Sequence, residues 1–368
     1  MHHAICAYHR LASSTMTRSM PIESKRRVLL NLIAIACIAA FLQLFAGCAS
    51  SKAGKAAAER SARLLSAHSF DDLSLSIEPR EGMVPTGVWR VQGTGSVVYL
   101  AATTHLVTSN QVPFPSSYYA AYHDSVEIYL EVDEQNSRLS EFRLTMQMMK
   151  WLRKNQAEFF YPKGQSLADE LEPETLRRVQ EFYGRDFKKV KSMRPVLLVF
   201  MAEAQQMGDQ FLEEGGVEDV FAARARMDRK RIRELDDSSV NEVVLLALDE
   251  MIYEIKRELE KSGVNAVVND ALFGSQEPVD ELYWRRGDLK AAQEELDEMR
   301  SQAPALYEKI GPERNRKWVP KILTALKGDR NVMILAGVAH FPGPEGLIAL
   351  LERAGFKVEQ LYGLDPRR

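Results

Sequence analysis

Two histidines follow similar segments near opposite ends of the sequence. Segment 96–105 reads Ser-Val-Val-Tyr-Leu-Ala-Ala-Thr-Thr-His, and segment 331–340 reads Asn-Val-Met-Ile-Leu-Ala-Gly-Val-Ala-His. Aligned without a gap, each is an apolar, partly β-branched run, then two small residues, two further residues and the histidine. A neutral imidazole can bind a transition metal or act as a general base. His105 and His340 are therefore the first candidates for chemistry, although a lone histidine in a chain of this size is more often structural.

Both segments predict where these histidines lie in the fold. A short apolar run bounded by turn signals is typical of a buried strand. Small residues just after such a run let the backbone turn tightly as it leaves the sheet. In open α/β sheets this edge is where sites are built. We expect the two strands to form an internal pseudo-repeat that brings both histidines to one cleft.

Carboxylates at strand ends are the next candidates. Glu131 and Asp133 lie near the end of a predicted strand at 126–133, which we expect to neighbour the His105 strand, and Glu131 is the stronger of the two. Asp236 ends a predicted short strand at 234–237 and is a secondary candidate, as is Asp133. The plainer interpretation of each is an exposed charge.

Arg314 and the absence of short motifs complete the search for chemistry. Arg314 opens a charged helix, where it is either solvated or positioned to bind an anionic group or stabilise an oxyanion. No HExxH motif is present, so a metal site would have to be assembled from distant strands. The sequence also lacks a P-loop, a GxGxxG turn after the first strand and a GxSxG elbow.

The order of predicted elements favours one α/β domain. Strand-rich ends flank a helical middle, so we expect a mixed central sheet with helices on its faces, spanning 84–365, with a helical insertion at about 137–310. Pro320 is expected to interrupt or restart the helix that opens at 313. The chain has 368 residues, 45% of them hydrophobic and 27% charged, with a net charge of −3. This balance gives no reason to expect a nucleic-acid partner.

The N-terminus has the pattern of a targeting segment. A basic stretch at 25–27 precedes an apolar run at 28–45, which ends in Ala46-Gly47-Cys48. Small residues directly before a cysteine resemble a bacterial lipobox, although Phe45 stands where leucine is usual. We therefore expect a lipoprotein signal peptide at 1–47, lipidation of Cys48 and a tether at 48–83. The alternative is a short transmembrane anchor.

This pattern also bears on compartment and redox chemistry. Either interpretation places the folded part outside the cytoplasm, and Ala49 after the cysteine favours the outer membrane, facing the periplasm. The chain has three cysteines, of which cleavage before Cys48 would leave one, consumed by lipid. The mature protein would then have neither a disulfide nor a catalytic thiol.

Several further motifs, in their order, resemble one family. They are Gly87-Val88-Trp89-Arg90-Val91, Ala102-Thr103-Thr104-His105, Tyr129-Leu130-Glu131-Val132-Asp133, Gly216-Val217-Glu218, Arg233-Glu234-Leu235-Asp236, Trp284-Arg285-Arg286-Gly287-Asp288, Glu313-Arg314-Asn315 and Gly337-Val338-Ala339-His340-Phe341-Pro342-Gly343. Together they resemble the TraB/GumN family, which includes the Tiki metalloproteases and is related to erythromycin esterase and ChaN-like proteins. Three positions depart from the family pattern: Ala102 replaces the first GxxH glycine, Asp236 replaces a glutamate, and Pro320 is expected to interrupt the helix after Glu313-Arg314-Asn315.

The resemblance implies a site and an activity. The family's two GxxH motifs, glutamate and arginine look like His105, His340, Glu131 and Arg314 here, with His105, Glu131 and His340 as ligands of a divalent Mn, Co or Zn ion. The implied function is a lipid-anchored extracytoplasmic hydrolase, a metal-dependent peptidase acting on a peptide or a small molecule. The alternatives are a ChaN-like lipoprotein that binds haem or another small ligand, and a catalytically degenerate envelope protein.

Overall fold

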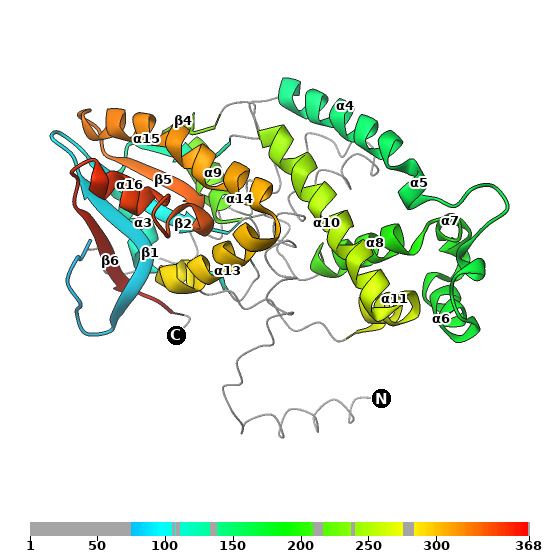
Figure 1. Ribbon diagram of the computed structural model, residues 1–368. Coiled ribbons are helices and arrows are strands. Elements are labelled where there is room, and N and C mark those ends of the chain that lie inside the picture. The colour runs from blue at the N-terminus through cyan, green and yellow to red at the C-terminus, as the bar shows by residue number, and fades with distance from the viewer. Residues whose placement is uncertain are drawn as a thin grey trace.

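The computed structural model describes residues 75–104, 107, 111–132, 138–208, 216–236, 240–274 and 283–366, and places a sheet-containing part beside a helical part (Figure 1). The predicted signal peptide, the lipidated Cys48, His105 and Asp133 lie outside these residues. Within them, no helix is both long and apolar enough to cross a bilayer.

The sheet has six strands in the order β4-β3-β5-β2-β1-β6. Its four strands β2 to β5 run parallel to one another, whereas β1 is antiparallel to both of its neighbours. The strands are β1 (Met83–Gln92), β2 (Val97–Thr103), β3 (Glu127–Leu130), β4 (Arg231–Glu234), β5 (Val332–Gly337) and β6 (Val358–Leu364). The predicted mixed α/β sheet is therefore confirmed.

The two strands that lead to the histidines are parallel neighbours. Their register runs from Val98 opposite Val332 to Thr103 opposite Gly337, one residue out of step with the gapless alignment of the two segments. The expectation that the Glu131 strand neighbours β2 is wrong, because β3 pairs with β5 on one side and β4 on the other. The strand β5 is buried along nearly all its length, which suits the interior of a sheet covered on both faces.

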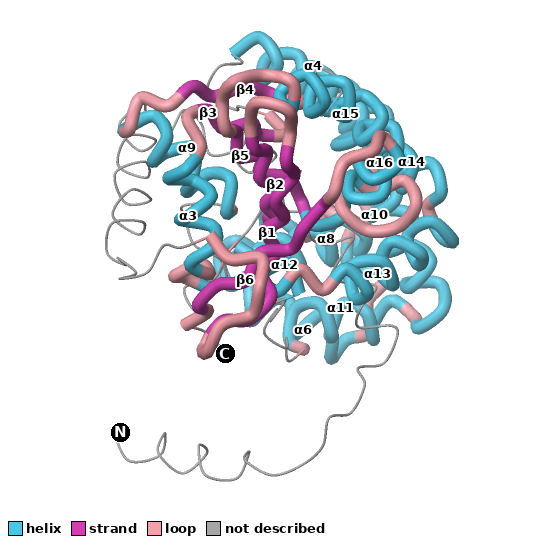
Figure 2. The backbone as a smooth tube through the Cα atoms, turned by 90° about the vertical axis from the view of Figure 1, so that its left-hand side faces the viewer, coloured by secondary structure: helices cyan, strands magenta, loops and turns pink. Residues whose placement is uncertain are grey.

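Helices cover both faces of this sheet (Figure 2). On one face lie α3 (Ser116–Asp124) and α9 (Val217–Met227), and on the other lie α15 (Pro312–Leu326) and α16 (Leu347–Arg353). The expectation that Pro320 interrupts the helix is wrong, because α15 continues through it. Pro320 is exposed, so water can hydrogen-bond to the backbone carbonyl that loses its helical partner.

The helices of the middle of the chain form a second hydrophobic core. Met148, Leu198, Leu248 and Val268 belong to it, separate from the core under the sheet. Its elements are α4 (Arg138–Lys154), α5 (Gln156–Phe159), α6 (Pro173–Tyr183), α7 (Phe187–Val190), α8 (Pro195–Gly208), α10 (Val240–Ser262) and α11 (Val264–Phe273), with 3₁₀ turns Leu167–Asp169 and Gly184–Asp186.

Three helices lead back from this second core to the sheet. They are α12 (Tyr283–Arg286), α13 (Leu289–Gln302) and α14 (Pro304–Ile310). On α13, Ala292 belongs to the core under the sheet and Met299 belongs to the helical core. One helix therefore packs into both cores.

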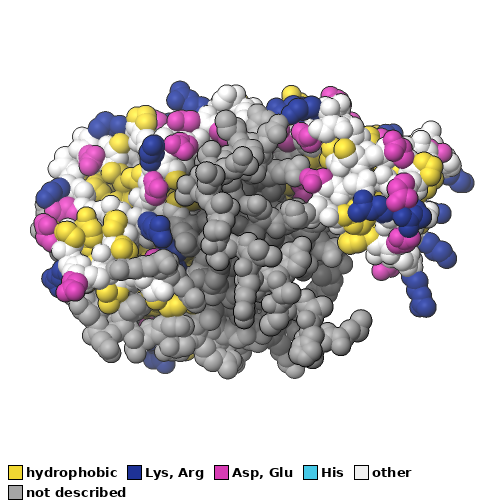
Figure 3. All heavy atoms as spheres, turned by 90° about the horizontal axis from the view of Figure 1, so that it is seen from below, with side chains coloured by type: hydrophobic (Ala, Val, Ile, Leu, Met, Phe, Trp, Pro, Cys, Tyr) yellow, Lys and Arg dark blue, Asp and Glu magenta, His cyan; other side chains and the backbone are white. Residues whose placement is uncertain are grey.

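Charged side chains of both signs are mixed on the face seen in Figure 3. Lys and Arg alternate there with Asp and Glu at the sheet end and at the helical end, with apolar side chains between them. This mixed surface accords with the nearly balanced composition of 48 basic and 51 acidic residues.

Candidate active site at the carboxyl edge of the sheet

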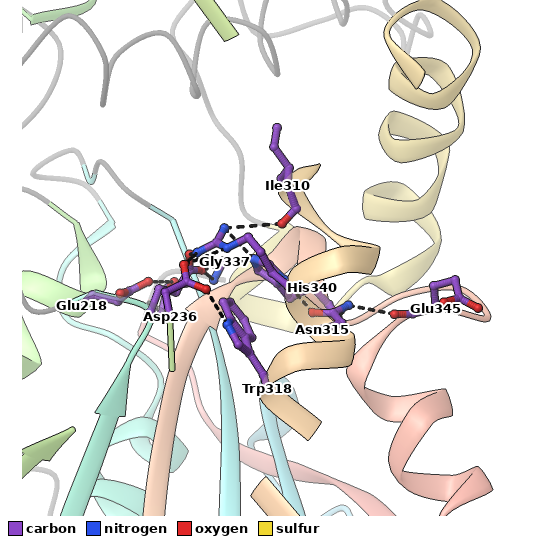
Figure 4. Close-up of polar contacts among 11 residues, drawn as sticks. Glu218, Asp236, Ile310, Asn315, Trp318, Gly337, His340 and Glu345 are labelled. Carbon is purple, nitrogen blue, oxygen red and sulfur yellow. Dashed lines mark hydrogen bonds and ion pairs between the residues drawn. The ribbon is translucent and has the colours of Figure 1, made fainter. Parts of the chain in front are cut away.

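Four predicted site residues meet where the parallel strands end (Figure 4). Glu131 directly follows β3, Asp236 follows β4, and His340 ends a 3₁₀ turn (Val338–His340) after β5. Arg314 comes from the first turn of α15. Each of the four is at most 8% exposed. The structure thus brings together residues more than 200 positions apart in sequence.

The backbone sets the spacing of the two carboxylates. Beyond the strands proper, Leu235 N–H donates to the Leu130 carbonyl at 2.8 Å and Asp236 N–H donates to the Glu131 carbonyl at 2.9 Å. Two backbone hydrogen bonds therefore join the segments that follow β3 and β4 beyond the last paired residues, Leu130 and Glu234. They place Glu131 and Asp236 side by side at the sheet edge.

The guanidinium of Arg314 joins these two carboxylates. Its Nη2 donates to Glu131 Oε2 and, at 2.6 Å, to Asp236 Oδ2, while Nε donates to the same Asp236 oxygen at 2.9 Å. Its Nη1 faces the Ile310 carbonyl at 3.4 Å and His340 Nε2 at 3.2 Å. All five guanidinium N–H groups thus have a partner. Burial alone would lower the pKa of Arg314, but the charges of Glu131 and Asp236 overcome this effect and raise that pKa above its usual value.

An aromatic side chain supports the cluster from one side. Trp318, one helical turn after Arg314, donates from Nε1 to Asp236 Oδ1 at 2.6 Å. The Trp318 ring lies 4.2 Å from the ring of His340, centroid to centroid, and the Arg314 guanidinium sits over it at 4.7 Å. Trp318 is fully buried and packs against Asp236, His340 and Arg314, which restricts the movement of all three side chains.

His340 is enclosed by hydrogen-bonding groups. Its Nδ1 lies 2.7 Å from Asn315 Oδ1, and its Nε2 lies 3.5 Å from Glu131 Oε1, which accepts a hydrogen bond of 2.6 Å from Gly337 N–H. Burial lowers the pKa of His340, an effect that the negative charge of Glu131 offsets only in part. The imidazole is therefore neutral at pH 7.

The structure adds Glu218, which sequence reasoning did not single out. It lies in the first turn of α9, next to Val217, whose N–H donates to the Thr104 carbonyl at 3.1 Å. Glu218 Oε1 accepts a hydrogen bond of 2.9 Å from the Thr103 hydroxyl at the end of β2. Desolvation and the nearby charge of Glu131 raise the pKa of Glu218 well above its usual range. Its only signal in the sequence is the Gly-Val-Glu motif.

The predicted residues thus fall into two groups. Glu131, Asp236, Arg314 and His340 are within hydrogen-bonding reach of one another through Arg314. His105 and Asp133 lie outside the described residues, although β2, which leads to His105, ends at the same edge of the sheet.

Comparison with known proteins identifies the family. The sequence model of the TraB/PrgY/gumN family matches residues 87–360, a span that contains the whole sheet edge described above. The chain belongs to the TraB/PrgY/gumN family. The resemblance predicted from the motifs is therefore confirmed. No curated protein and no solved structure matches the chain.

The resemblance to the Tiki metalloproteases implies a metal ion, and the side chains at the sheet edge show whether they could hold one. Within the described residues, no three His, Cys, Asp or Glu side chains are arranged to hold a metal ion. Of the predicted ligands, His340 Nε2 and Glu131 both face the Arg314 guanidinium, which supplies the positive charge that a metal would bring. The described arrangement does not fit a metal ion unless Arg314 moves away.

Proposed function

We propose that this TraB/PrgY/gumN protein is a hydrolase whose active site is the cluster of Glu131, Asp236, Arg314 and His340. The observation that carries the proposal is the burial of two carboxylates, a guanidinium and an imidazole at one sheet edge. Burying charged groups costs free energy that hydrophobic side chains of similar volume would not cost. Such clusters with shifted pKa values are typical of functional sites, and this sheet edge is where α/β proteins build them.

His340 suits the role of general base. It is neutral, because its pKa is lowered by burial, and its Nε2 faces Glu131 and Arg314. In the resting site the lone pair of Nε2 accepts from Arg314 Nη1 at 3.2 Å, so in the proposed reaction the attacking water displaces this contact before Nε2 takes its proton. Glu131, held by Gly337 N–H and Arg314, stabilises the imidazolium that forms. The water oxygen bonds to the substrate carbonyl carbon, and the imidazolium then gives its proton to the leaving amine or alcohol as the C–N or C–O bond breaks.

Arg314 suits the role of electrostatic stabiliser. The Nη1 contact with the Ile310 carbonyl is the longest hydrogen-bond contact of Arg314, at 3.4 Å. This N–H can therefore exchange the carbonyl for a substrate oxygen as its acceptor with the smallest loss of hydrogen-bond energy. Negative charge that develops on the substrate carbonyl would then face a guanidinium fixed by Asp236 and Glu131. We propose a peptide as substrate, with a small-molecule ester or amide as the alternative.

A metal-dependent form of this hydrolase also remains proposed. It would need a divalent ion held by His105, Glu131 and His340, with His105 contributed from outside the described residues. Elemental analysis of the purified full chain tests it, alone and after addition of Mn, Co or Zn. Near-stoichiometric metal that is lost in a His105→Ala, His340→Ala double variant would support the metal-dependent form, and no metal in either protein would contradict it.

The hydrolase itself is tested with the detergent-solubilised full chain and a broad peptide library. We expect cleavage that His340→Gln and Glu131→Gln reduce by roughly a hundredfold or more, since a general base contributes about that factor. The matched control is His123→Gln, on the exposed end of α3. Cleavage that persists unchanged in the His340 and Glu131 variants would contradict the proposal.

Anchoring and the remaining alternatives need separate measurements. We propose that Cys48 carries lipid and holds the protein at the outer membrane, facing the periplasm. Intact mass measurement of the membrane-extracted protein, with Cys48→Ser as control, should show the added lipid only on the wild type. Haem binding stays an alternative prediction, for which a Soret band that appears on titration and is lost in His340→Ala would be the support.

A further inference from the structure

The orientation of the Asn315 side chain is fixed by its own hydrogen bonds. Its Nδ2 donates to the carbonyl of His340 at 3.1 Å and to the carbonyl of Glu345 at 2.8 Å (Figure 4). Both acceptors are carbonyl oxygens, which cannot donate. The nitrogen end of this amide therefore faces the two carbonyls, and the oxygen end must face the other way.

The oxygen end of Asn315 faces the imidazole. Asn315 Oδ1 lies 2.7 Å from His340 Nδ1, and both side chains are 2% exposed. An amide oxygen only accepts hydrogen bonds, so Nδ1 must carry the proton at this distance. In a neutral imidazole the other nitrogen, Nε2, is then unprotonated.

Two contacts on the opposite side of the ring agree with this assignment. Arg314 Nη1 lies 3.2 Å from Nε2, and a guanidinium only donates, so Nε2 must accept. Glu131 Oε1 stands off at 3.5 Å, beyond the usual hydrogen-bond length, as expected for two acceptors that share no proton.

We infer that Asn315 is a positioning residue that holds His340 in the tautomer with a proton on Nδ1, so that Nε2 presents its lone pair to the site. The catalytic consequence of this inference rests on the proposed hydrolase. An imidazole held in this form can take a proton at Nε2 without first changing tautomer, once water displaces the Arg314 Nη1 contact. At metal sites, partners that orient a histidine through its second nitrogen typically affect activity by roughly 10- to 100-fold, and we expect the same range for Asn315.

Asn315 also donates to two backbone carbonyls, so a role in holding the backbone must be distinguished from a role in fixing the tautomer of His340. Asn315→Asp keeps an acceptor oxygen for Nδ1 but loses the amide donors to His340 and Glu345. Asn315→Leu, of similar size, loses the acceptor as well as the donors. A structural role predicts that the two variants behave alike, whereas the positioning role predicts that they differ.

The direct test is long-range ¹H–¹⁵N correlation NMR of the full chain labelled with ¹⁵N-histidine. The His340 signals are identified by their loss in His340→Gln. We expect wild type and Asn315→Asp to show a protonated Nδ1, an unprotonated Nε2 and a Nδ1 proton protected from exchange with water. Asn315→Leu should lose that protection.

Two results would overturn the inference. One is a wild-type His340 that carries its proton on Nε2. The other is an Asn315→Leu variant whose Nδ1 proton is as protected as that of the wild type, which would assign the tautomer to Arg314 alone. If Asn315→Leu does not fold, the wild-type and Asn315→Asp spectra still decide the assignment.

The NMR readout needs no turnover, so it separates this inference from the proposed hydrolase. Where peptide cleavage is measurable, kcat should fall roughly 10- to 100-fold in Asn315→Leu and much less in Asn315→Asp, with KM little changed in both. Equal losses of kcat in the two variants would count against the positioning role. An absence of cleavage in the wild type would count against the hydrolase alone.

Discussion

Arg314 directs two of its nitrogens, Nε at 2.9 Å and Nη2 at 2.6 Å, at a single oxygen of Asp236. The side chains of Arg314 and Asp236 are 10% and 3% exposed, so little water can replace the partner that either would lose. The interaction therefore behaves as a buried ion pair. Removing one member of such a pair leaves a desolvated charge without compensation.

We expect Asp236→Asn to lower the free energy of unfolding by about 3 kcal/mol, at the lower end for breaking a buried pair, because Arg314 keeps Glu131. Urea denaturation measures the change. The control is Glu181→Gln, which removes an ion-pair partner of Arg177. The Arg177 side chain is 55% exposed, so this change should cost at most about 1 kcal/mol. Equal costs at the two sites would show that burial of Arg314 has no energetic effect.

The Trp318 indole offers a measurement of a single hydrogen bond to a buried carboxylate. Trp318→Phe removes the 2.6 Å bond to Asp236 Oδ1 and also leaves a cavity. Trp284→Phe is the matched control, because Trp284 is equally buried and its indole N–H has no hydrogen-bond partner in the described part of the chain. We expect Trp318→Phe to cost about 1.5–3 kcal/mol more than Trp284→Phe in chemical denaturation. Similar costs would mean that the Asp236 contact contributes nothing net.

Glu218 should make stability depend on pH in a direction opposite to that of an ion-paired carboxylate. Its pKa is raised in the folded state, so above the ordinary glutamate pKa the folded chain binds more protons than the unfolded chain. Its contribution to stability therefore falls as pH rises from about 4.3 towards the raised pKa, by at most about 1.4 kcal/mol per pH unit.

Glu218→Gln removes this dependence. The difference in unfolding free energy between Glu218→Gln and wild type should shift in favour of the variant as pH rises from 5 to 8. Thermal or urea unfolding over that range measures it, with Glu352→Gln, an exposed position on α16, as control. A difference that is constant with pH, or that shifts in favour of wild type, would contradict the raised pKa.

Gly87 is a position where the backbone leaves no room for a side chain. A Cβ there would lie 1.9 Å from the Trp284 carbonyl oxygen and 2.6 Å from the Tyr118 hydroxyl. Gly87→Ala should therefore destabilise the protein by about 1–3 kcal/mol or more, since α12 and α3 would have to shift. Gly311→Ala, whose nearest neighbour would be the Tyr307 carbonyl at 3.7 Å, is the control and should be close to neutral. The melting temperatures of Gly87→Ala and Gly311→Ala, or their yields of folded protein relative to wild type, measure the difference. Equal values for the two variants would contradict the prediction.

The sequence predicted the parts of the site that depend on local pattern. Glu131 and His340 are candidates in the sequence because Glu131 lies near the end of a predicted strand and His340 lies just beyond one, and strand ends can be predicted from apolar runs and turn residues. The similar segments predict that both histidine strands lead to one cleft. Neither the pairing of β2 with β5 nor the position of β3 beside β5 can be predicted from them, because strand order is set by burial and crossover packing across the whole sheet.

The parts that were missed depend on distances between remote segments. Nothing near Asn315 in the sequence indicates that its amide reaches His340, and Glu218 becomes notable only because β2 and Glu131 lie beside it. Proline in a helix interior predicts a break at Pro320, but α15 continues through it, because Pro320 is exposed and water can bind the carbonyl that loses its partner.

The helix α13 has Ala292 in one hydrophobic core and Met299 in the other. A rearrangement of the helices packed around Met299 would therefore have to be accommodated where Ala292 packs under the sheet. The chain leads from α13 through α14 to Ile310, whose carbonyl faces Arg314. A ligand or neighbouring molecule that displaced the distant helices would therefore act on the segment that directly precedes Arg314, beside the longest of its guanidinium hydrogen-bond contacts.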